Sequence, residues 1–187
     1  MKNNNHPLSQ ERWDLLDQNR VPIGKTLRRG EKIPAEIYHI VVLGWIVNRK
    51  GEFLISRRSP EKSNPLLWET TGGAKQAGED SLKAVIREIR EEVGIDVSKN
   101  RPVFLGTRQR LERVFFDCWM FFKDFSLESV TLQQGETCDA RWVNDDTFLE
   151  MMQKGQITRA STDFYPLMKG WRDLLFKNED FESLSGE

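Results

Sequence analysis

The sequence has few cysteines, no long apolar run and no excess of one charge, and each shortage excludes a class of protein. Its two cysteines, Cys118 and Cys138, are too few for a disulfide framework and lie in no C-x-x-C pattern, so we expect free thiols. No apolar stretch approaches the roughly eighteen residues of a membrane-spanning helix. The 28 basic and 29 acidic residues nearly balance, which gives no support for a dedicated nucleic-acid binder.

The N-terminus also lacks the pattern of a secretion signal. It opens with the polar residues MKNNNHPLSQ and has no apolar core that ends in small residues. We therefore expect a cytoplasmic protein. At 187 residues the chain has the length of one domain with an appended element. A small charged molecule is a simpler partner for this composition than a nucleic acid or a membrane.

What the sequence does contain is an alternation of strand-like and helix-like segments. Two short alternating runs flank the polar turn D-Q-N-R, which predicts an N-terminal hairpin after about ten disordered residues. The β-branched run at 36–48 and the segment FLISRRS predict a central strand pair. The run VFFDCWMFF at 114–122 is apolar on both faces, as in a strand covered by two layers.

The C-terminal half adds a short strand, ARWVN, and two helices. Asn144 can cap a helix that Gly155 ends, and a last helix is predicted over 163–178 despite Pro166 near its start. The pattern indicates an α/β domain with helices on both faces of its sheet. We expect an N-terminal extension over 1–35, a main domain over 36–178 and a flexible tail over 179–187.

One segment, GGAKQAGEDSLKAVIREIREEVGI at 72–95, carries an unusual cluster of acids. At roughly 100° per residue, Glu88, Glu91 and Glu92 share one helix face. An apolar stripe formed by Leu82, Val85, Ile86, Ile89 and Val93 lies on a separate arc and can anchor the helix on the sheet. Carboxylates so close together repel one another, and a hard cation such as Mg²⁺ would offset that repulsion. The alternative is a solvated acidic face that Lys83 and Arg87 partly balance.

Glycines precede this helix in a pattern that favours the metal-site interpretation. The pair Gly72-Gly73 and then Gly78 bracket a loop that leads into the helix, and Gly94 can end it. Paired glycines let backbone groups approach a ligand or a metal closely. A lone glycine pair would usually indicate only a turn.

The spacing of these residues resembles the Nudix box at every fixed position. Gly73 is followed after five residues by Glu79, and a further seven residues separate Glu79 from the run R-E-I-R-E-E-V-G-I at 87–95. The N-terminal segments ERWDLLDQNRVPIGKTLRRG, YHIVV and FLISRRS are also similar to the subgroup related to isopentenyl-diphosphate isomerases. The resemblance implies an α/β/α sandwich with a mixed sheet. It also implies hydrolysis of a nucleoside diphosphate linked to another moiety.

The resemblance further implies roles for residues of the box. Glu88 and Glu92 would be the principal ligands of Mg²⁺ or Mn²⁺, Glu91 a further ligand or a base acting through water, and the backbone at Gly73 another oxygen donor. Arg87 would pair with Glu79 and orient the loop. Bound cations would activate a water that attacks one phosphorus of a small-molecule diphosphate, and no nucleophilic side chain would be needed.

Residues outside the box are assigned with alternatives. The resemblance also implies a base from a loop just before a strand like ARWV, where Glu136 is the nearest candidate and Asp139 the next. Arg57 and Arg58 end a predicted strand; one of them binds a substrate phosphate, or both are surface charges. We interpret His39 as a strand residue with a hydrogen-bonded ring. Trp13 and Trp68 are interpreted as packing residues.

Two other functions remain as alternatives. The segment WETTGGAK has neither the cysteine nor the histidines of the isomerases, so an isomerase is disfavoured. It also lacks the proline that many Nudix hydrolases have before the paired glycines, a departure that bears on the substrate and not on the metal. A Nudix module that binds a nucleotide without cleaving it would not need all three glutamates. Trp171 and Phe176, which we expect to be exposed on the last helix, make a homodimer plausible.

Overall fold

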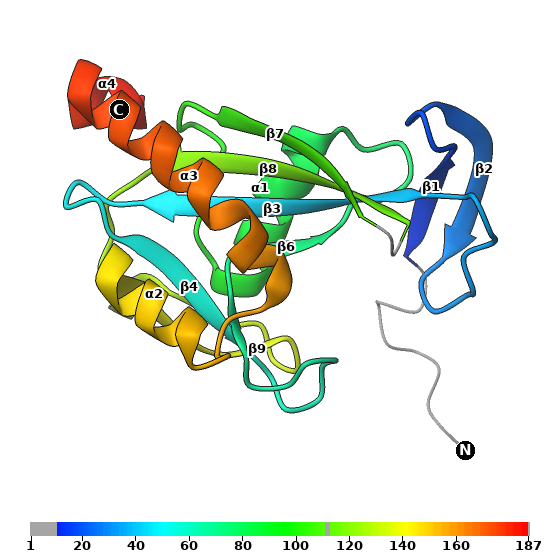
Figure 1. Cartoon of the computed structure of the whole chain (residues 1–187), viewed down its shortest axis with the longest axis horizontal. Coiled ribbons are helices and arrows are strands. Elements are labelled where there is room, and N and C mark those ends of the chain that lie inside the picture. The colour runs from blue at the N-terminus through cyan, green and yellow to red at the C-terminus, as the bar shows by residue number, and fades with distance from the viewer. Residues whose placement is uncertain (1–10, 111–112, 187) are drawn as a thin grey trace.

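The computed structural model describes residues 11–110 and 113–186 as a mixed sheet, a small hairpin and helices on both sides of the sheet (Figure 1). The strands are β1 (Arg12–Leu16), β2 (Pro22–Arg28), β3 (His39–Val47), β4 (Phe53–Arg58), β5 (Trp68–Glu69), β6 (Thr71–Ala74), β7 (Val103–Arg110), β8 (Val114–Phe122) and β9 (Thr137–Val143). The helices are α1 (Ser81–Val93), α2 (Asp145–Gln153), α3 (Arg159–Asn178) and α4 (Phe181–Ser185). The ten N-terminal residues that were expected to be disordered lie outside the described part of the chain.

β3 is the central strand of the sheet. It runs parallel to β8 along its whole length, from His39 beside Val114 to Val47 beside Phe122. On its other side, β6 pairs with the middle of β3, whereas β4 meets β3 only where Val47 lies opposite Phe53. The predicted central pair of β3 and β4 is therefore reduced to one paired position, because β6 occupies the place beside β3.

Alternate residues of β3 face two separate cores, as expected for a strand covered on both sides. Leu43 and Trp45 join the core that α2 and α3 cover, while Val42 and Ile46 join the core beneath α1. In Figure 1, α3 lies in front of the sheet and α1 lies behind it. The predicted α/β sandwich with a mixed sheet is confirmed.

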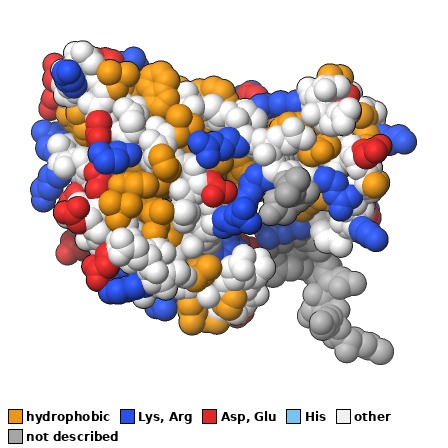
Figure 2. Space-filling view, viewed as in Figure 1, with side chains coloured by type: hydrophobic (Ala, Val, Ile, Leu, Met, Phe, Trp, Pro, Cys, Tyr) orange, Lys and Arg blue, Asp and Glu red, His pale blue; other side chains and the backbone are white. Residues whose placement is uncertain are grey.

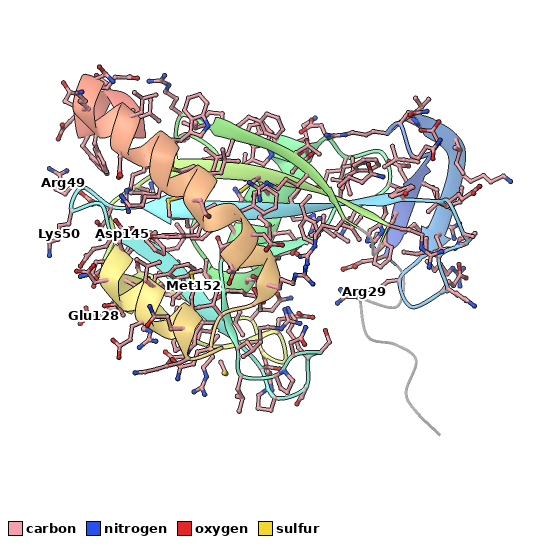
Figure 3. All side chains as sticks on the ribbon, viewed as in Figure 1. Arg29, Arg49, Lys50, Glu128, Asp145 and Met152 are labelled. Carbon is pink, nitrogen blue, oxygen red and sulfur yellow. The ribbon has the colours of Figure 1, made fainter. Side chains whose placement is uncertain are left out.

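α3 starts earlier than the sequence predicted, at Arg159 rather than near residue 163, so that Pro166 lies inside it. Proline removes one helical hydrogen bond. Burial of Phe164 and Met168 on the inner face holds the helix together around it. At its other end, Arg172 forms an ion pair of 2.7 Å with Asp145, which Figure 3 labels at the start of α2.

The N-terminal hairpin of β1 and β2 is present as predicted and is tied to the loop that precedes α1. The Asp14 carboxylate accepts hydrogen bonds from Lys75 Nζ at 2.9 Å and from the Gly78 backbone at 2.8 Å. The carbonyl of Arg12 accepts from the backbone of Ala77 at 2.8 Å. The hairpin is thus a fixed wall at one end of the sheet (Figure 1).

Two expectations for the C-terminus are wrong. The segment predicted as a flexible tail contains α4, in which Leu184 is fully buried. The Ser185 carbonyl of this helix accepts a hydrogen bond from the Asn100 side chain at 3.0 Å. Phe176 is half-buried against Phe122 rather than exposed, which leaves Trp171 as the exposed aromatic of the predicted pair.

Two smaller expectations can also be compared with the structure. Cys118 is buried and Cys138 exposed, each as a free thiol. Among the described helices, none has both the length and the apolar character needed to cross a membrane.

Candidate active site

The acid-bearing helix α1 is fixed at both ends and along one side. The Asp80 side chain caps it by accepting from the Lys83 backbone at 2.7 Å, and Gly94 ends it in the left-handed conformation, with φ of 73°. Val85 and Ile89 are fully buried against β3. Gly44 permits this contact, since a Cβ there would lie 2.7 Å from a methyl of Val85. The side of α1 that carries the glutamates therefore points in a fixed direction.

That side of α1 forms one wall of a cavity of about 210 Å³. The other walls come from the hairpin, β3, β6 and two loops. The lining residues are Glu11, Trp13, Arg29, His39, Val41, Lys62, Gly72, Gly73, Ala74, Glu88, Glu91, Glu92, Gln133 and Glu136. Arg29, labelled in Figure 3, lies between the hairpin and the rest of the domain. The cavity thus brings together Glu88, Glu91, Glu92, Gly73 and Glu136, the predicted metal and base residues.

Glu92 is the most buried of these acids, with 2% of its surface exposed. Its Oε2 atom has no hydrogen-bond partner among the described residues, and Oε1 lies 3.4 Å from Lys62 Nζ. Burial raises the pKa of Glu92 to about 8, and neighbouring carboxylates add to the shift while Lys62 opposes it. An oxygen left unpaired in such a place indicates room for a cation.

Glu88 lies against the paired glycines of β6. A Cβ at Gly73 would fall 2.3 Å from the Glu88 carboxyl carbon, so any side chain at this position would displace that carboxylate. Burial raises the pKa of Glu88 to about 7, against the opposing effect of Arg87. Glu91 has a more exposed side chain at the cavity edge.

Arg87 connects the acids of α1 to the preceding loop. Its Nε donates to one oxygen of Glu79 and one terminal nitrogen donates to the other, each at 3.0 Å, so the two side chains form a bidentate pair. The other terminal nitrogen donates to Glu88 at 2.7 Å and to Glu91 at 3.1 Å. The predicted pairing of Arg87 with Glu79 is present, and the same guanidinium also holds two of the acids.

The loop before β9 contributes Glu136 and not Asp139. The Glu136 carboxylate lies 2.6 Å from Lys62 and 3.8 Å from Arg29, inside the cavity. Asp139 is exposed, and its side chain accepts from the backbone of Ala140. Of the two predicted base candidates, the structure brings only Glu136 to the other acids.

Arg57 and Arg58 organise the loop after β4 instead of lining the acidic cavity. Arg58 forms an ion pair of 2.6 Å with Glu69 and donates to the Ser63 carbonyl at 2.7 Å. Arg57 donates to the Leu66 carbonyl at 3.1 Å and lies over the ring of Trp68, which is buried as predicted. Arg58 does line a neighbouring cavity that shares Arg29, Lys62 and Glu136 with the acidic one.

His39 differs from its interpretation as a hydrogen-bonded strand residue. Its ring stacks on Trp13, with centroids 4.7 Å apart and planes 10° from parallel. Its Nδ1 atom has no hydrogen-bond partner among the described residues, and neither does Nε1 of Trp13. Burial lowers the pKa of His39 to about 4, so the ring is neutral at pH 7. Both aromatic residues line the acidic cavity.

Sequence reasoning missed several residues of the cavity, above all Lys62, Arg29 and Glu11. Lys62 lies in SPEKSN, which reads as an ordinary polar loop. Burial pushes the pKa of Lys62 down, but Glu92, Glu136 and Glu69 outweigh it and raise the pKa above its usual value. No local signal in the sequence identifies a lysine that acquires its carboxylate partners only through the fold.

The donor set fits a hard divalent cation. The described residues include no cluster of three or more His, Cys, Asp or Glu side chains already arranged to hold a metal. Glu88 and Glu92 nevertheless face one cavity beside the half-buried Gly73, and one Glu92 oxygen has no partner among the described residues. Lys62 and Arg87 supply the positive charge next to these acids. Carboxylate and carbonyl oxygens are the ligands that Mg²⁺ and Mn²⁺ favour.

Comparison with known families matches the NUDIX domain to residues 37–166. The chain belongs to the Nudix family. An uncharacterized Nudix hydrolase of Listeria monocytogenes is 38% identical over 150 residues, which cover 78% of this chain and 87% of that protein. The prediction of a Nudix pyrophosphohydrolase is confirmed at the level of the enzyme class.

Two further comparisons bear on the fold and the subgroup. The crystal structure of DR0079 from Deinococcus radiodurans has a TM-score of 0.67 and 24% identity, and the match covers 79% of this chain and 92% of that one. An isopentenyl-diphosphate Delta-isomerase of Escherichia coli is 31% identical over 98 residues, or 51% of this chain and 54% of that enzyme. The predicted likeness to the isomerase-related subgroup is confirmed.

Proposed function

We propose that this Nudix protein hydrolyses, with Mg²⁺ or Mn²⁺, the diphosphate bond of a small molecule in which a nucleoside diphosphate is linked to another moiety. One observation carries the proposal. Glu92 is buried and Glu88 half-buried in the same cavity, both have raised pKa values, and one oxygen of Glu92 has no partner among the described residues. Such a pair is costly without a cation and is suited to holding one.

The residues of the cavity have distinct tasks in this proposal. Glu88, Glu92 and the backbone of Gly73 would hold the cation, which when bound lowers the pKa of water and offsets charge on the phosphates. Arg87 keeps Glu88 and Glu91 in place through its bidentate pair with Glu79.

The attacking water also needs a proton acceptor. Glu136 is held at 2.6 Å by Lys62 and faces the same cavity, so we assign it as the base. Glu91, at the cavity edge, is the alternative base or a further ligand. Arg29 reaches Glu136 at 3.8 Å and is a better candidate for a phosphate contact than Arg57 or Arg58.

An isoprenoid-diphosphate isomerase is the second candidate, because the Escherichia coli isomerase is a relative over 98 residues. The thiols argue against it. Cys118 lies in the core, where burial raises the pKa of its thiol to about 12, and Cys138 is not a lining residue of the acidic cavity. A cysteine could therefore not serve as a proton donor or acceptor within this cavity.

A substrate panel tests the proposed function. The protein is incubated with nucleotide sugars, dinucleotides, nucleoside triphosphates and prenyl diphosphates, with Mg²⁺ and with a chelator, and phosphate-containing products are measured. We expect cleavage that depends on Mg²⁺ and that Glu92→Gln reduces by orders of magnitude. Full activity of that variant, or no cleavage of any compound, would contradict the proposal.

A cytoplasmic location and a homodimer through the face of Trp171 also stay predictions.

A further inference from the structure

A second and larger cavity, of about 600 Å³, lies between the edge strand β7 and the first turns of α3. The described residues that line it are Tyr38, Arg108, Gln109, Arg110, Arg159, Asp163 and Phe164. Three of them are arginines and one is a carboxylate. This arginine cavity, defined by Arg108, Arg110 and Arg159, has no task in the hydrolysis proposed above.

Aromatic rings and Asp163 hold the arginines in place. Arg108 lies over the ring of Phe164 at 5.2 Å and donates to the Asp163 carbonyl at 2.6 Å. Arg110 lies over Phe116 at 5.6 Å and is 3.4 Å from the Asp163 carboxylate. A guanidinium stacked on a ring keeps its edge available for an oxyanion, and an arginine fork matches phosphate or carboxylate geometry.

Arg159 completes the group and is the most accessible of the three. Its side chain is 80% exposed and lies 4.0 Å from Asp163, a weak contact. It is the first residue of α3, a helix whose N-terminus has no side-chain cap. The positive end of the helix dipole therefore adds to the charge of the arginines. The Asp163 carboxylate lies near Arg110 and Arg159, and its backbone carbonyl accepts from Arg108.

The register of the sheet places this cavity on the same face as part of the acidic cavity. Val41 on β3 lies opposite Phe116 on β8, which lies opposite Arg108 on β7. Paired residues on neighbouring strands point to the same face. Val41 lines the acidic cavity and Arg108 lines the arginine cavity, so one row of side chains connects them. Ala74 on β6, opposite Val41, continues the row to the glycines beside Glu88.

The separation of the two cavities follows from strand spacing. From β6 to β7 there are three steps, through β3 and β8. At about 4.8 Å a step, the backbones lie roughly 14 Å apart, and the arginine side chains shorten the gap. Figure 2 shows Lys and Arg side chains gathered around an acidic one in the middle of the face that α3 covers.

We propose that the arginine cavity binds a second anionic group, a phosphate or a carboxylate, carried by the moiety attached to the diphosphate. The inference rests on the proposed function, because it assigns that anion to the substrate whose diphosphate lies at Glu88 and Glu92. The substrate is then a diphosphate with a further negative charge about one nucleoside length away. Diphosphates that end in a neutral moiety are poorer substrates.

The first experiment tests the anion site without catalysis. Inorganic phosphate is titrated into metal-free protein while the side-chain Nε–Hε signals of arginine are followed by NMR. We expect saturable shifts of Arg108 and Arg159 that persist in the control Lys177→Gln, an exposed position on the same helix. In Arg108→Gln/Arg159→Gln the phosphate response of this region is lost. Arg159→Glu, at the exposed residue, replaces the double variant should that one not fold. Unshifted Arg108 and Arg159 signals in the parent protein overturn the proposal.

The second experiment asks whether the anion belongs to the substrate. Dissociation constants of metal-free protein are measured for matched pairs that differ by one phosphate, namely NADPH with NADH and coenzyme A with dephospho-coenzyme A. We expect tighter binding of at least one phosphorylated member by about tenfold or more, and a ratio near one in the arginine variant. If the arginine variant leaves the ratios of the dissociation constants unchanged, the arginine cavity binds an anion that is not part of the substrate. That result overturns the assignment of the anion to the substrate.

These outcomes are separable from the hydrolase proposal. Both experiments measure binding without metal, so a protein that cleaves nothing can still bind phosphate at the arginines. Conversely, a panel that shows metal-dependent cleavage while the arginine signals stay unshifted removes the second site and leaves the hydrolase. Neither variant alters a residue of the acidic cavity.

Discussion

Single atoms decide much of the behaviour of the acidic cavity. Gly73 illustrates this, because its missing side chain is the space that the Glu88 carboxyl occupies, at 2.3 Å from where a Cβ would lie. Glu92 adds an oxygen without a partner among the described residues. The site therefore depends on close packing of a backbone against carboxylates, and small changes in volume should be felt there.

Gly73→Ala is expected to remove most of the activity and to destabilise the fold by about 1–3 kcal/mol, because Glu88 must move to admit a methyl group. Gly170→Ala is the matched control. Gly170 lies in α3, and a Cβ there would meet no side chain or neighbouring segment of the described chain within 4 Å, so alanine should be neutral or stabilise by up to about 1 kcal/mol. Thermal denaturation and turnover measure both. Equal effects of the two variants would contradict the steric account.

At the scale of elements, the hairpin and the C-terminal helix show how peripheral segments support the centre. β1 supplies Trp13 to the acidic cavity and Asp14 to the loop before α1. α4 closes the other end of the molecule by burying Leu184. The hairpin bears on catalysis and α4 on stability. Variants that remove these contacts of the hairpin should therefore change activity, whereas variants in α4 should change only the stability of the fold.

Asp14→Asn is expected to lower the ratio kcat/KM several-fold and to destabilise the protein by about 1–3 kcal/mol. The substitution keeps the shape of the side chain but removes the charge that pairs with the largely buried amine of Lys75. Lys25→Gln, at an exposed position of β2, is the control that should change neither quantity. Steady-state kinetics and denaturant unfolding measure the two quantities. Unchanged kinetics in Asp14→Asn would show that the ion pair between Asp14 and Lys75 is not needed for the site.

Leu184→Ala in α4 should destabilise the fold by about 2–4 kcal/mol while the activity of the folded fraction stays the same. The side chain is fully buried but lies far along the chain from the acidic cavity. Leu174→Ala on α3 removes the same atoms from an exposed position and should cost less than about 0.5 kcal/mol. Denaturant unfolding distinguishes them. A small effect at Leu184 would mean that the tail is loosely attached after all.

At the scale of the whole molecule, stability should depend on pH and on divalent metal together. The pKa of Glu92 is raised to about 8 in the folded protein from an ordinary value of 4.5. The unfolded chain therefore loses this proton first as pH rises, and the stability that the protonated group contributes below pH 4.5 is lost as pH rises through about 8. Glu88, with a pKa of about 7, acts in the same direction.

We expect the melting temperature of metal-free protein to fall between about pH 5 and pH 8. Mg²⁺ should raise it more at pH 8 than at pH 5, because protons compete with the cation for the same oxygens. In Glu92→Gln both the pH slope and the response to Mg²⁺ should be smaller. Calorimetry at several pH values measures this. A response to Mg²⁺ that is independent of pH and of Glu92 would be inconsistent with our ligand assignment.

The parts of this molecule that a sequence reveals are those set by local periodicity. Glu88 and Glu92 could be placed on one face because they share one helix, and Gly94 ends that helix as a local rule predicts. The start of α3 at Arg159 could not be placed, because its first turns are held by burial of Ser161 and Phe164, which no local signal in the sequence marks. Lys62 could not be recognised at all, since its carboxylate partners lie at positions 30 and 74 residues further along the chain.

The walls of the acidic cavity come from segments that are distant in sequence, from Glu11 in the extension to Glu136 before β9. A ligand that binds there touches the hairpin, the Lys62 loop, α1 and the Glu136 loop at once. Local opening of any one of these segments must then break contacts with the ligand. Amide hydrogen exchange should accordingly slow in all four regions together on binding, because one bound molecule would stabilise segments that are distant in the sequence.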